Sequence, residues 1–223
     1  MRKWGIVISV LYALILLCVI APGAVYLTAD KDSSWQDLLK GVGEAYRVWL
    51  FWVPAAAILA SQALLLFLSV DTSQKRLKPR SHILVSVAVG ALLTALLSAA
   101  VIWSLGFAMR GENFWDPYFK KQTDTLLFWA ALWVLWGVLF FLYLRNSSAV
   151  VTRLISWLLK GSVLELLIVV PCHVIVRRRH DCSAPMVTSF GIATGIAITL
   201  LSFGPSVLFL YKKRLDSYPP RPS

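Results

Sequence analysis

The chain alternates long apolar runs with short polar connections. A helix rises about 1.5 Å per residue, so roughly 20 apolar residues cross a hydrocarbon layer about 30 Å thick. Six runs reach that length, at residues 4–27, 48–70, 83–109, 125–144, 154–176 and 186–211. The pattern predicts an all-α, polytopic bundle of six transmembrane spans that forms one domain over residues 1–211. A short basic, proline-rich tail at residues 212–223 follows.

Small residues mark two of these runs as helix-packing faces. Gly90, Thr94 and Ser98 lie four apart in the third run, and Gly191 and Gly195 lie four apart in the sixth. Such spacing lets helix backbones approach closely in lipid, where no hydrophobic effect drives helices together. We expect the third run to lie at the centre of the bundle.

An aromatic stripe follows the fourth run at helical spacing. It consists of Trp129, Trp133, Trp136, Phe140 and Tyr143. A chromophore or quinone site has this pattern, but so does a face that packs against lipid or another helix. We favour the packing interpretation.

The first connection contains a helix-start signal. Asp32, Ser33 and Ser34 precede an amphipathic stretch that includes Trp35, Leu38 and Leu39. Aspartate and serine side chains at a helix start accept hydrogen bonds from the first free amides of the helix. The pattern predicts a short capped helix lying at the membrane interface.

Composition agrees with a membrane protein and argues against most enzyme classes. Of 223 residues, 58% are hydrophobic and 15% charged, against about a quarter charged in a soluble domain. No room remains for a soluble catalytic domain. The chain has no P-loop, Gly-rich dinucleotide turn, HExxH or GxSxG motif. We therefore favour a non-enzymatic protein, with no catalytic residue, resident metal or cofactor predicted.

The chain has a net charge of +11, and its basic residues are concentrated in short connections between the runs. Such residues set the orientation of the spans and contact anionic lipid headgroups. We therefore do not expect nucleic-acid binding. Both termini are expected in the cytoplasm. Six spans then place Arg177, Arg178 and Arg179 outside, against the positive-inside tendency. Five spans with a re-entrant fifth segment is the alternative, but it moves the basic tail outside. We prefer six spans, because that arrangement places more of the basic residues on the cytoplasmic side.

One stretch concentrates the chemistry of the chain. Residues 160–185 carry a candidate functional cluster of Lys160, Glu165, Cys172, His173, Arg177, Arg178, Arg179, His180, Asp181 and Cys182. Ionisable groups within a membrane are costly, which makes Glu165 a candidate site. Glu165 either serves packing as a protonated or hydrogen-bonded group, or relays a proton or cation. Lys160 lies about 140° away around a helix, so it pairs poorly with Glu165. Thr94, Ser98 and Gly204 are the alternative partners considered for it.

The cysteines and histidines of this stretch suggest weaker alternatives. A Cys-His-x6-His-Cys pattern is not a usual zinc spacing, and the arginines oppose a cation. A Cys172–Cys182 disulfide is plausible in an oxidising compartment, and the arginines favour a reactive thiolate. The arginines themselves suit a lipid phosphate, an acidic partner subunit or an anionic substrate.

The motif LELLIVVPCHVIVRRRHDC resembles a stretch of bacterial multi-pass inner-membrane proteins that have no assigned activity. The resemblance covers roughly residues 160–205. It implies a bacterial inner (plasma) membrane location and no mechanism.

Among the possible functions we favour a non-enzymatic subunit or scaffold, whose small-residue faces pack against other membrane-protein subunits or a second copy. The first alternative is a small transporter or channel-like protein that uses Glu165 and helices broken or kinked at Pro171 and Gly204-Pro205. The second alternative is a thiol-redox or metal-binding membrane protein that uses Cys172 and Cys182.

Overall fold

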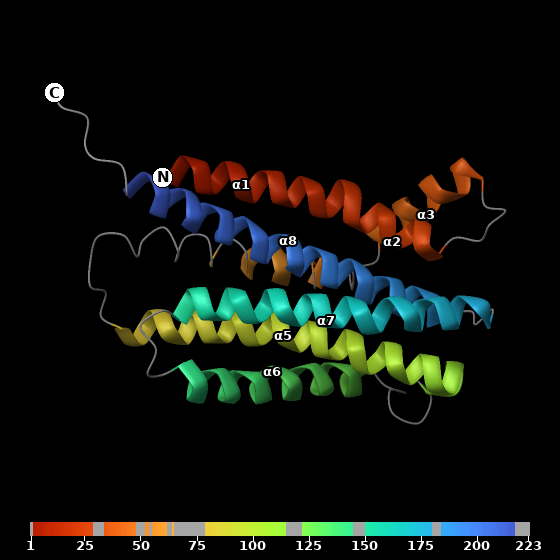
Figure 1. Ribbon diagram of the computed structural model, residues 1–223. Coiled ribbons are helices and arrows are strands. Elements are labelled where there is room, and N and C mark those ends of the chain that lie inside the picture. Colours follow the sequence, from red (N-terminus) through yellow and green to blue (C-terminus); the bar gives the residue numbers. More distant parts are fainter. Residues whose placement is uncertain are drawn as a thin grey trace.

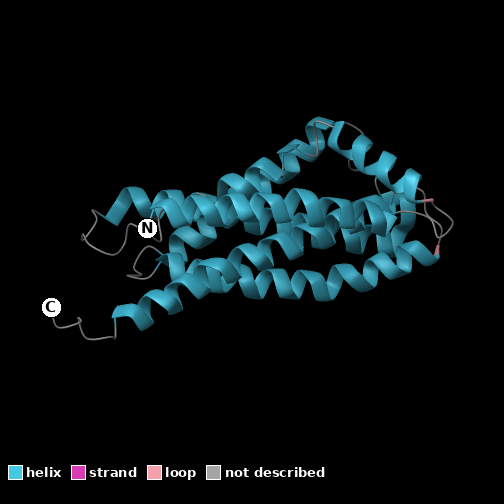
Figure 2. Ribbon diagram, turned by 90° about the horizontal axis from the view of Figure 1, so that it is seen from above, coloured by secondary structure: helices cyan, strands magenta, loops and turns pink. Residues whose placement is uncertain are grey.

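The computed structural model describes residues 2–28, 34–47, 52–53, 55–61, 64, 79–114, 122–144, 150–179 and 184–216. Almost all of these residues are helical, and no strand occurs among them (Figure 2). The N-terminal helices are α1 (Arg2–Ile15), the π-helical η1 (Leu16–Ile20), α2 (Ala21–Thr28) and α3 (Trp35–Arg47). The remaining elements are α5 (Pro79–Arg110), the 3-10 helix η2 (Gly111–Phe114), α6 (Gln122–Leu144), α7 (Val150–Arg178) and α8 (Ala184–Asp216).

The fold class is the predicted one, but the number of spans is not confirmed. Four helices, α5, α6, α7 and α8, are long and apolar enough to cross a membrane. The first predicted span corresponds to the continuous stretch α1–η1–α2. Most of the second, at residues 48–70, lies outside the described residues. The helices are compatible with an integral membrane protein.

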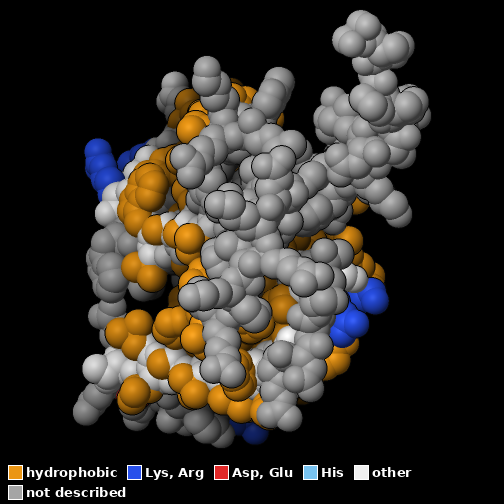
Figure 3. All heavy atoms as spheres, turned by 90° about the vertical axis from the view of Figure 1, so that its left-hand side faces the viewer, with side chains coloured by type: hydrophobic (Ala, Val, Ile, Leu, Met, Phe, Trp, Pro, Cys, Tyr) orange, Lys and Arg blue, Asp and Glu red, His pale blue; other side chains and the backbone are white. Residues whose placement is uncertain are grey.

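The long helices alternate in direction. α5 and α7 run parallel, and α6 and α8 run in the opposite direction (Figure 1). Residue 2 and residue 216 therefore lie at the same end of the bundle, and α3 lies at the other end (Figure 1). Seen from the end that carries the termini, hydrophobic side chains cover much of the flanks, and Lys and Arg side chains appear at the outline (Figure 3).

α5 is the central helix, as its small residues predict. It packs against α6, α7 and α8, and 61% of its apolar stretch is buried, against 6% for α6. A Cβ built at Gly90 would lie 2.8 Å from Cγ of Leu154 on α7. The glycine thus allows α7 to approach the α5 backbone, so this small-residue face is used inside the fold.

The aromatic stripe of α6 packs against its neighbours. Nε1 of Trp136 donates to Oγ of Ser98 at 2.9 Å, and Nε1 of Trp133 donates to the Ala88 carbonyl oxygen at 2.9 Å. Trp129 lies against Trp103 of α5, with ring centroids 5.7 Å apart. These contacts agree with the packing interpretation of the stripe.

Helix α3 begins where the sequence predicts. The Asp37 amide donates to Oγ of Ser34 at 3.3 Å, and Ser34 donates to the Asp37 carboxylate from its amide and its hydroxyl, at 3.0 and 2.7 Å. This reciprocal arrangement is a capping box. At its other end, the Tyr46 hydroxyl donates to the carbonyl oxygen of Leu17. The π-helical turn η1 contains Leu17, so Tyr46 joins α3 to the first helical stretch.

The last two helices are continuous at their prolines, so a break at either position is wrong, while a kink at either position stays a prediction. α7 is helical from Val150 through Pro171 to Arg178, and α8 is helical through Gly204-Pro205 to Asp216. α7 continues across the bundle without turning back, which does not support the re-entrant fifth segment of the five-span alternative. Packing against neighbouring helices in lipid allows proline to remain in such helices.

Candidate functional site

Glu165 lies on the face of α7 that packs against α5 and α8. Ser162, Val169, Cys172 and Val176 share this face at intervals of three or four residues, and all are buried. The Glu165 side chain is only 1% exposed. Neither carboxylate oxygen has a hydrogen-bond partner among the described residues. A buried acidic group without partners is rare because losing water costs several kcal/mol, on the order of 2–7 even for a neutral polar group.

Gly195 of α8 provides the space that this carboxyl group occupies. A Cβ built at Gly195 would collide with Oε2 of Glu165 and would lie 2.9 Å from its Cδ. One turn away, a Cβ at Gly191 would lie 3.0 Å from Cγ1 of Val169 and 3.5 Å from Oγ of Ser104. The two glycines therefore bring the α8 backbone against α7, and Gly195 brings it against the carboxyl group itself.

The hydroxyl groups beyond Glu165 are bonded elsewhere. Thr199 donates from Oγ1 to the Gly195 carbonyl oxygen at 2.8 Å or to Oγ of Ser162 at 2.9 Å. Ser162 in turn donates to the Leu159 carbonyl oxygen at 3.0 Å. Ser162 and Thr199 form a polar pair close to the carboxyl group without bonding to it.

The partners considered for Glu165 from the sequence do not bond to it. Thr94 donates to the carbonyl oxygen of Gly90 and Ser98 donates to that of Thr94, both at 2.8 Å. Gly204 supplies no bond either, since both carboxylate oxygens lack partners. Lys160 is exposed, while Glu165 is buried, so the two side chains occupy different faces of α7 as their spacing predicts.

His173 forms a second polar pair on the same α7–α8 contact. Its Nδ1 lies 2.7 Å from Oγ1 of Thr188, and both side chains are buried. The Thr188 hydroxyl lies 3.2 Å and 3.1 Å from the carbonyl oxygens of Ala184 and Pro185. If it donates to one of them, the hydroxyl accepts from the protonated Nδ1 of His173.

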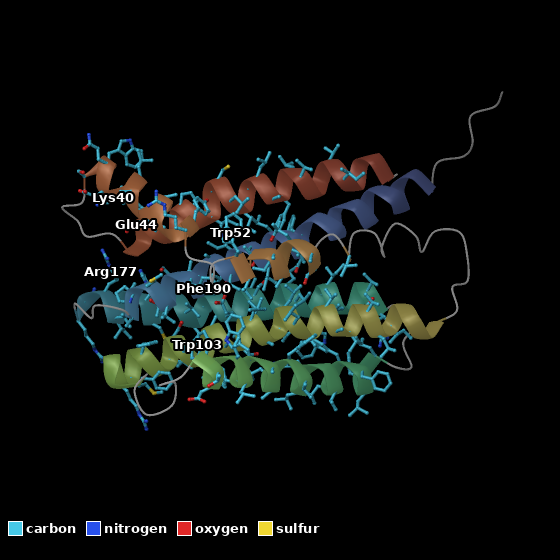
Figure 4. All side chains as sticks on the ribbon, turned by 180° about the vertical axis from the view of Figure 1, so that it is seen from behind. Lys40, Glu44, Trp52, Trp103, Arg177 and Phe190 are labelled. Carbon is cyan, nitrogen blue, oxygen red and sulfur yellow. The ribbon has the colours of Figure 1, made fainter. Side chains whose placement is uncertain are left out.

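The arginines lie at the end of α7 away from the chain termini. Nη1 of Arg179 donates to the Ala108 carbonyl oxygen at 2.7 Å and so binds the last turn of α5. Gly111, with a φ of 63°, begins the turn that follows α5. Figure 4 shows Arg177 at the same end of the molecule as Lys40 and Glu44 of α3. Arg178 is exposed.

The remaining members of the predicted cluster are not brought together. Cys172 is a free thiol and only 5% exposed. His180, Asp181 and Cys182 lie outside the described residues. Within the described ranges, no group of three or more His, Cys, Asp and Glu side chains is placed to hold a metal ion.

Three polar residues of the site were not among the predicted ones. Ser104 has a buried hydroxyl without a hydrogen-bond partner among the described residues, and Ser162 and Thr188 bond as described above. The signal for Thr188 is its place in the row 188, 191, 195 and 199, at intervals of three or four residues along α8. Ser104 has no such signal, because only the packing of α5 brings it to this row.

Comparison with known proteins adds no assignment. No protein-family model, no curated protein and no solved structure matches the chain. The function must therefore be argued from the site.

Proposed function

We propose that this integral membrane protein binds and translocates a proton or a small cation at Glu165. The observation that carries the proposal is the carboxyl group itself, which is 1% exposed, has both oxygens without partners, and lies against the Gly195 backbone. Ionisable groups in this position are characteristic of ion pathways in transporters and pumps.

The surroundings support a functional role over a packing role. A side chain kept only for packing is apolar or has its polar atoms bonded. Here the hydroxyls that could bond to Glu165, those of Ser162 and Thr199, bond to each other and to backbone carbonyl oxygens. The hydrogen-bonding capacity of the carboxyl oxygens is thus unused within the described part of the chain.

The experiment is ion flux in proteoliposomes containing the purified full chain. A membrane potential is imposed with potassium and valinomycin, and H⁺ and Na⁺ movements are followed with separate indicators. We expect flux of one of these ions, reduced at least tenfold in Glu165→Gln. Lys160→Gln is the matched control, because Lys160 is charged but exposed on another face of the same helix. Absence of any Glu165-dependent flux with folded protein would refute the proposal.

We also propose assembly with other membrane-protein subunits. The glycine faces of α5 and α8 pack inside the bundle, so they are not the surface that would meet a partner. The exposed apolar side of α6, which includes Leu135, Val138 and Leu142, is the surface available to lipid or to a partner helix. Cross-linking in native membranes through single cysteines placed on α6 tests it. Only monomers would argue against a subunit role.

We also propose a bacterial inner-membrane location with both termini cytoplasmic and with Arg178 in contact with anionic headgroups. The exposure of Arg178 beside the bonded Arg179 supports the headgroup contact. Native mass spectrometry of the parent protein and of Arg178→Ala tests the contact. We expect the variant to retain less anionic lipid. Fluorescent-protein and alkaline-phosphatase fusions at both ends test the orientation.

A further inference from the structure

The polar side chains at the α7–α8 contact form a row along the helix axes. His173 pairs with Thr188, Glu165 lies against Gly195, and Ser162 pairs with Thr199. From residue 188 to residue 199 the row extends about 16 Å, at about 1.5 Å per residue. This is about half the hydrocarbon thickness of a bilayer.

The row has one apolar interruption, between His173 and Glu165. Val169 fills this level from α7 and contacts the α8 backbone at Gly191. Oγ of Ser104 reaches the same level from α5, 3.5 Å from the position that a Cβ of Gly191 would take. Its hydroxyl is buried and has no partner among the described residues. Ser104 therefore places a free donor and acceptor between the His173–Thr188 pair and the carboxyl group.

The chemistry around Glu165 suits a proton better than a metal cation. A hard cation such as Ca²⁺ takes about six to eight oxygen ligands, and Na⁺ also needs several. The carboxyl group lies against the α8 backbone at Gly195, and neither of its oxygens has a hydrogen-bond partner among the described residues. The described part of the chain also holds no carboxylate or histidine cluster that could complete a metal site.

No other charge faces Glu165 from the helices packed against it. Residues 83–109 of α5 and 184–203 of α8 contain no ionisable side chain. On α7 itself, the ionisable neighbours are Lys160, which is exposed, and Cys172 and His173, which are buried. Of these residue types, histidine is the common proton shuttle in proteins.

We infer that the ligand of Glu165 is a proton, and that it reaches the carboxyl group from the Arg177 end of the bundle through His173, Thr188 and Ser104. The inference rests on the function proposed above and names its ion and its route. The imidazole takes up a proton from that end, and the hydroxyls of Thr188 and Ser104 each pass one proton on and receive one in turn. No hydrogen bond joins Ser104 to Thr188 or to Glu165 in this structure, so the Ser104 side chain must rotate to reach each of them. No bond other than O–H or N–H is made or broken, and no redox partner is needed.

The test compares H⁺ and Na⁺ flux in proteoliposomes for variants along the row. We expect Glu165-dependent H⁺ flux without Na⁺ flux, slowed at least tenfold in Ser104→Ala and in His173→Gln, and restored in part to His173→Gln by added imidazole. Ser202→Ala is the matched control, because Ser202 is an equally buried serine that donates to the Ile198 carbonyl oxygen at 2.8 Å. We expect it to conduct protons at the parent rate.

The outcomes separate the inference from the function on which it rests. Glu165-dependent Na⁺ flux without H⁺ flux would overturn the inference and leave the proposed function standing. Glu165-dependent H⁺ flux at the parent rate in both Ser104→Ala and His173→Gln would overturn the route. No Glu165-dependent flux of either ion would overturn both.

Infrared difference spectra provide a second readout, in which we expect a carboxyl band that appears with a change of pH and disappears in Glu165→Gln. A spectrum without that band would overturn the proton as ligand.

Discussion

Replacement of Gly195 by alanine tests whether the glycine exists to make room for the Glu165 carboxyl group. The added Cβ would collide with Oε2, lie 2.9 Å from Cδ of Glu165 and lie 2.9 Å from Cδ2 of Leu166. The Leu166 side chain can rotate away. The carboxyl group is enclosed between α7 and α8, so it must turn towards other buried groups or the two helices must separate.

The magnitude follows from two opposing effects. Overpacking a dense interior costs about 1–3 kcal/mol, while alanine favours a helix over glycine by about 1 kcal/mol. We expect Gly195→Ala to lower the free energy of unfolding by up to about 2 kcal/mol, or up to about 30-fold in the equilibrium constant. If the carboxyl group causes the collision, the overpacking cost should vanish when Glu165 is already alanine, and Gly195→Ala should then stabilise the protein by about 1 kcal/mol. The coupling energy between the two positions is then the overpacking cost itself, about 1–3 kcal/mol.

The assay is reversible unfolding in mixed micelles by increasing SDS, followed by circular dichroism, for the parent, the two single variants and the double variant. Gly43→Ala is the matched control, since a Cβ at this helical position of α3 meets nothing within 4 Å. We expect it to be neutral or slightly stabilising. Equal losses from Gly195→Ala with and without the Glu165 side chain would refute the reasoning, because the obstacle would then be something other than the carboxyl group.

Two further predictions concern hydrogen bonds outside the site. Trp136→Phe removes the hydrogen bond from Nε1 to Ser98 Oγ and should lower the free energy of unfolding by about 0.6 kcal/mol, the average for such bonds in a membrane protein. The SDS unfolding assay measures this loss. Ser98→Ala should cause little further loss in the Trp136→Phe protein. Hydrogen bonds from the Ser34 side chain and then its amide hold the pKa of Asp37 below its usual value. The capping interaction is therefore complete above the ordinary carboxyl pKa and is lost as pH falls through the lowered value. Ser34→Ala should raise the pKa of Asp37 towards normal, as measured by carboxyl ¹³C chemical shifts in nanodiscs, and an unchanged titration would contradict the capping box.

The sequence predicted the helices well because their lengths and boundaries depend on local patterns. The apolar run at residues 125–144 corresponds to α6 at Gln122–Leu144, and Ser34 caps α3 where its residue type indicates. Residues 154–176 were predicted as one span, but the sequence left open whether Pro171 interrupts the helix, and α7 continues through it. A proline's effect depends on which neighbours stabilise the helix around it, and that is tertiary information.

Glu165 itself was predicted as a candidate from its residue type in an apolar run, but its surroundings were not. Its contact with Gly195 is made between two antiparallel helices, α7 and α8, and packing sets the register between these helices. Ser104 approaches from a third helix. A single sequence without these contacts cannot distinguish a bonded carboxyl group from one without partners, so the choice between packing and function required the fold.

Replacement of Glu165 by methionine separates those two roles most directly. Replacing a residue that stabilises the fold should lower the free energy of unfolding. Replacing a buried polar group without partners by an apolar one should raise it, because the polar group itself destabilises the fold. Replacing even a buried ion pair by apolar residues of similar volume is often neutral or stabilising by about 1–4 kcal/mol, and a buried polar group without hydrogen bonds is costly by itself. Because both Glu165 oxygens lack partners and the side chain is 1% exposed, we expect Glu165→Met to raise the free energy of unfolding and to abolish ion flux.

That combination, a more stable protein without flux, is the mark of a residue retained for function at the expense of stability. Destabilisation of Glu165→Met by more than about 1 kcal/mol would mean that the carboxyl group makes structural bonds, and the packing role would be the better explanation. Glu165→Gln, measured beside it, keeps the shape and polarity of the side chain and removes only its ability to ionise. If glutamine loses flux while retaining parent stability, the ionisable proton is what the protein requires at this position.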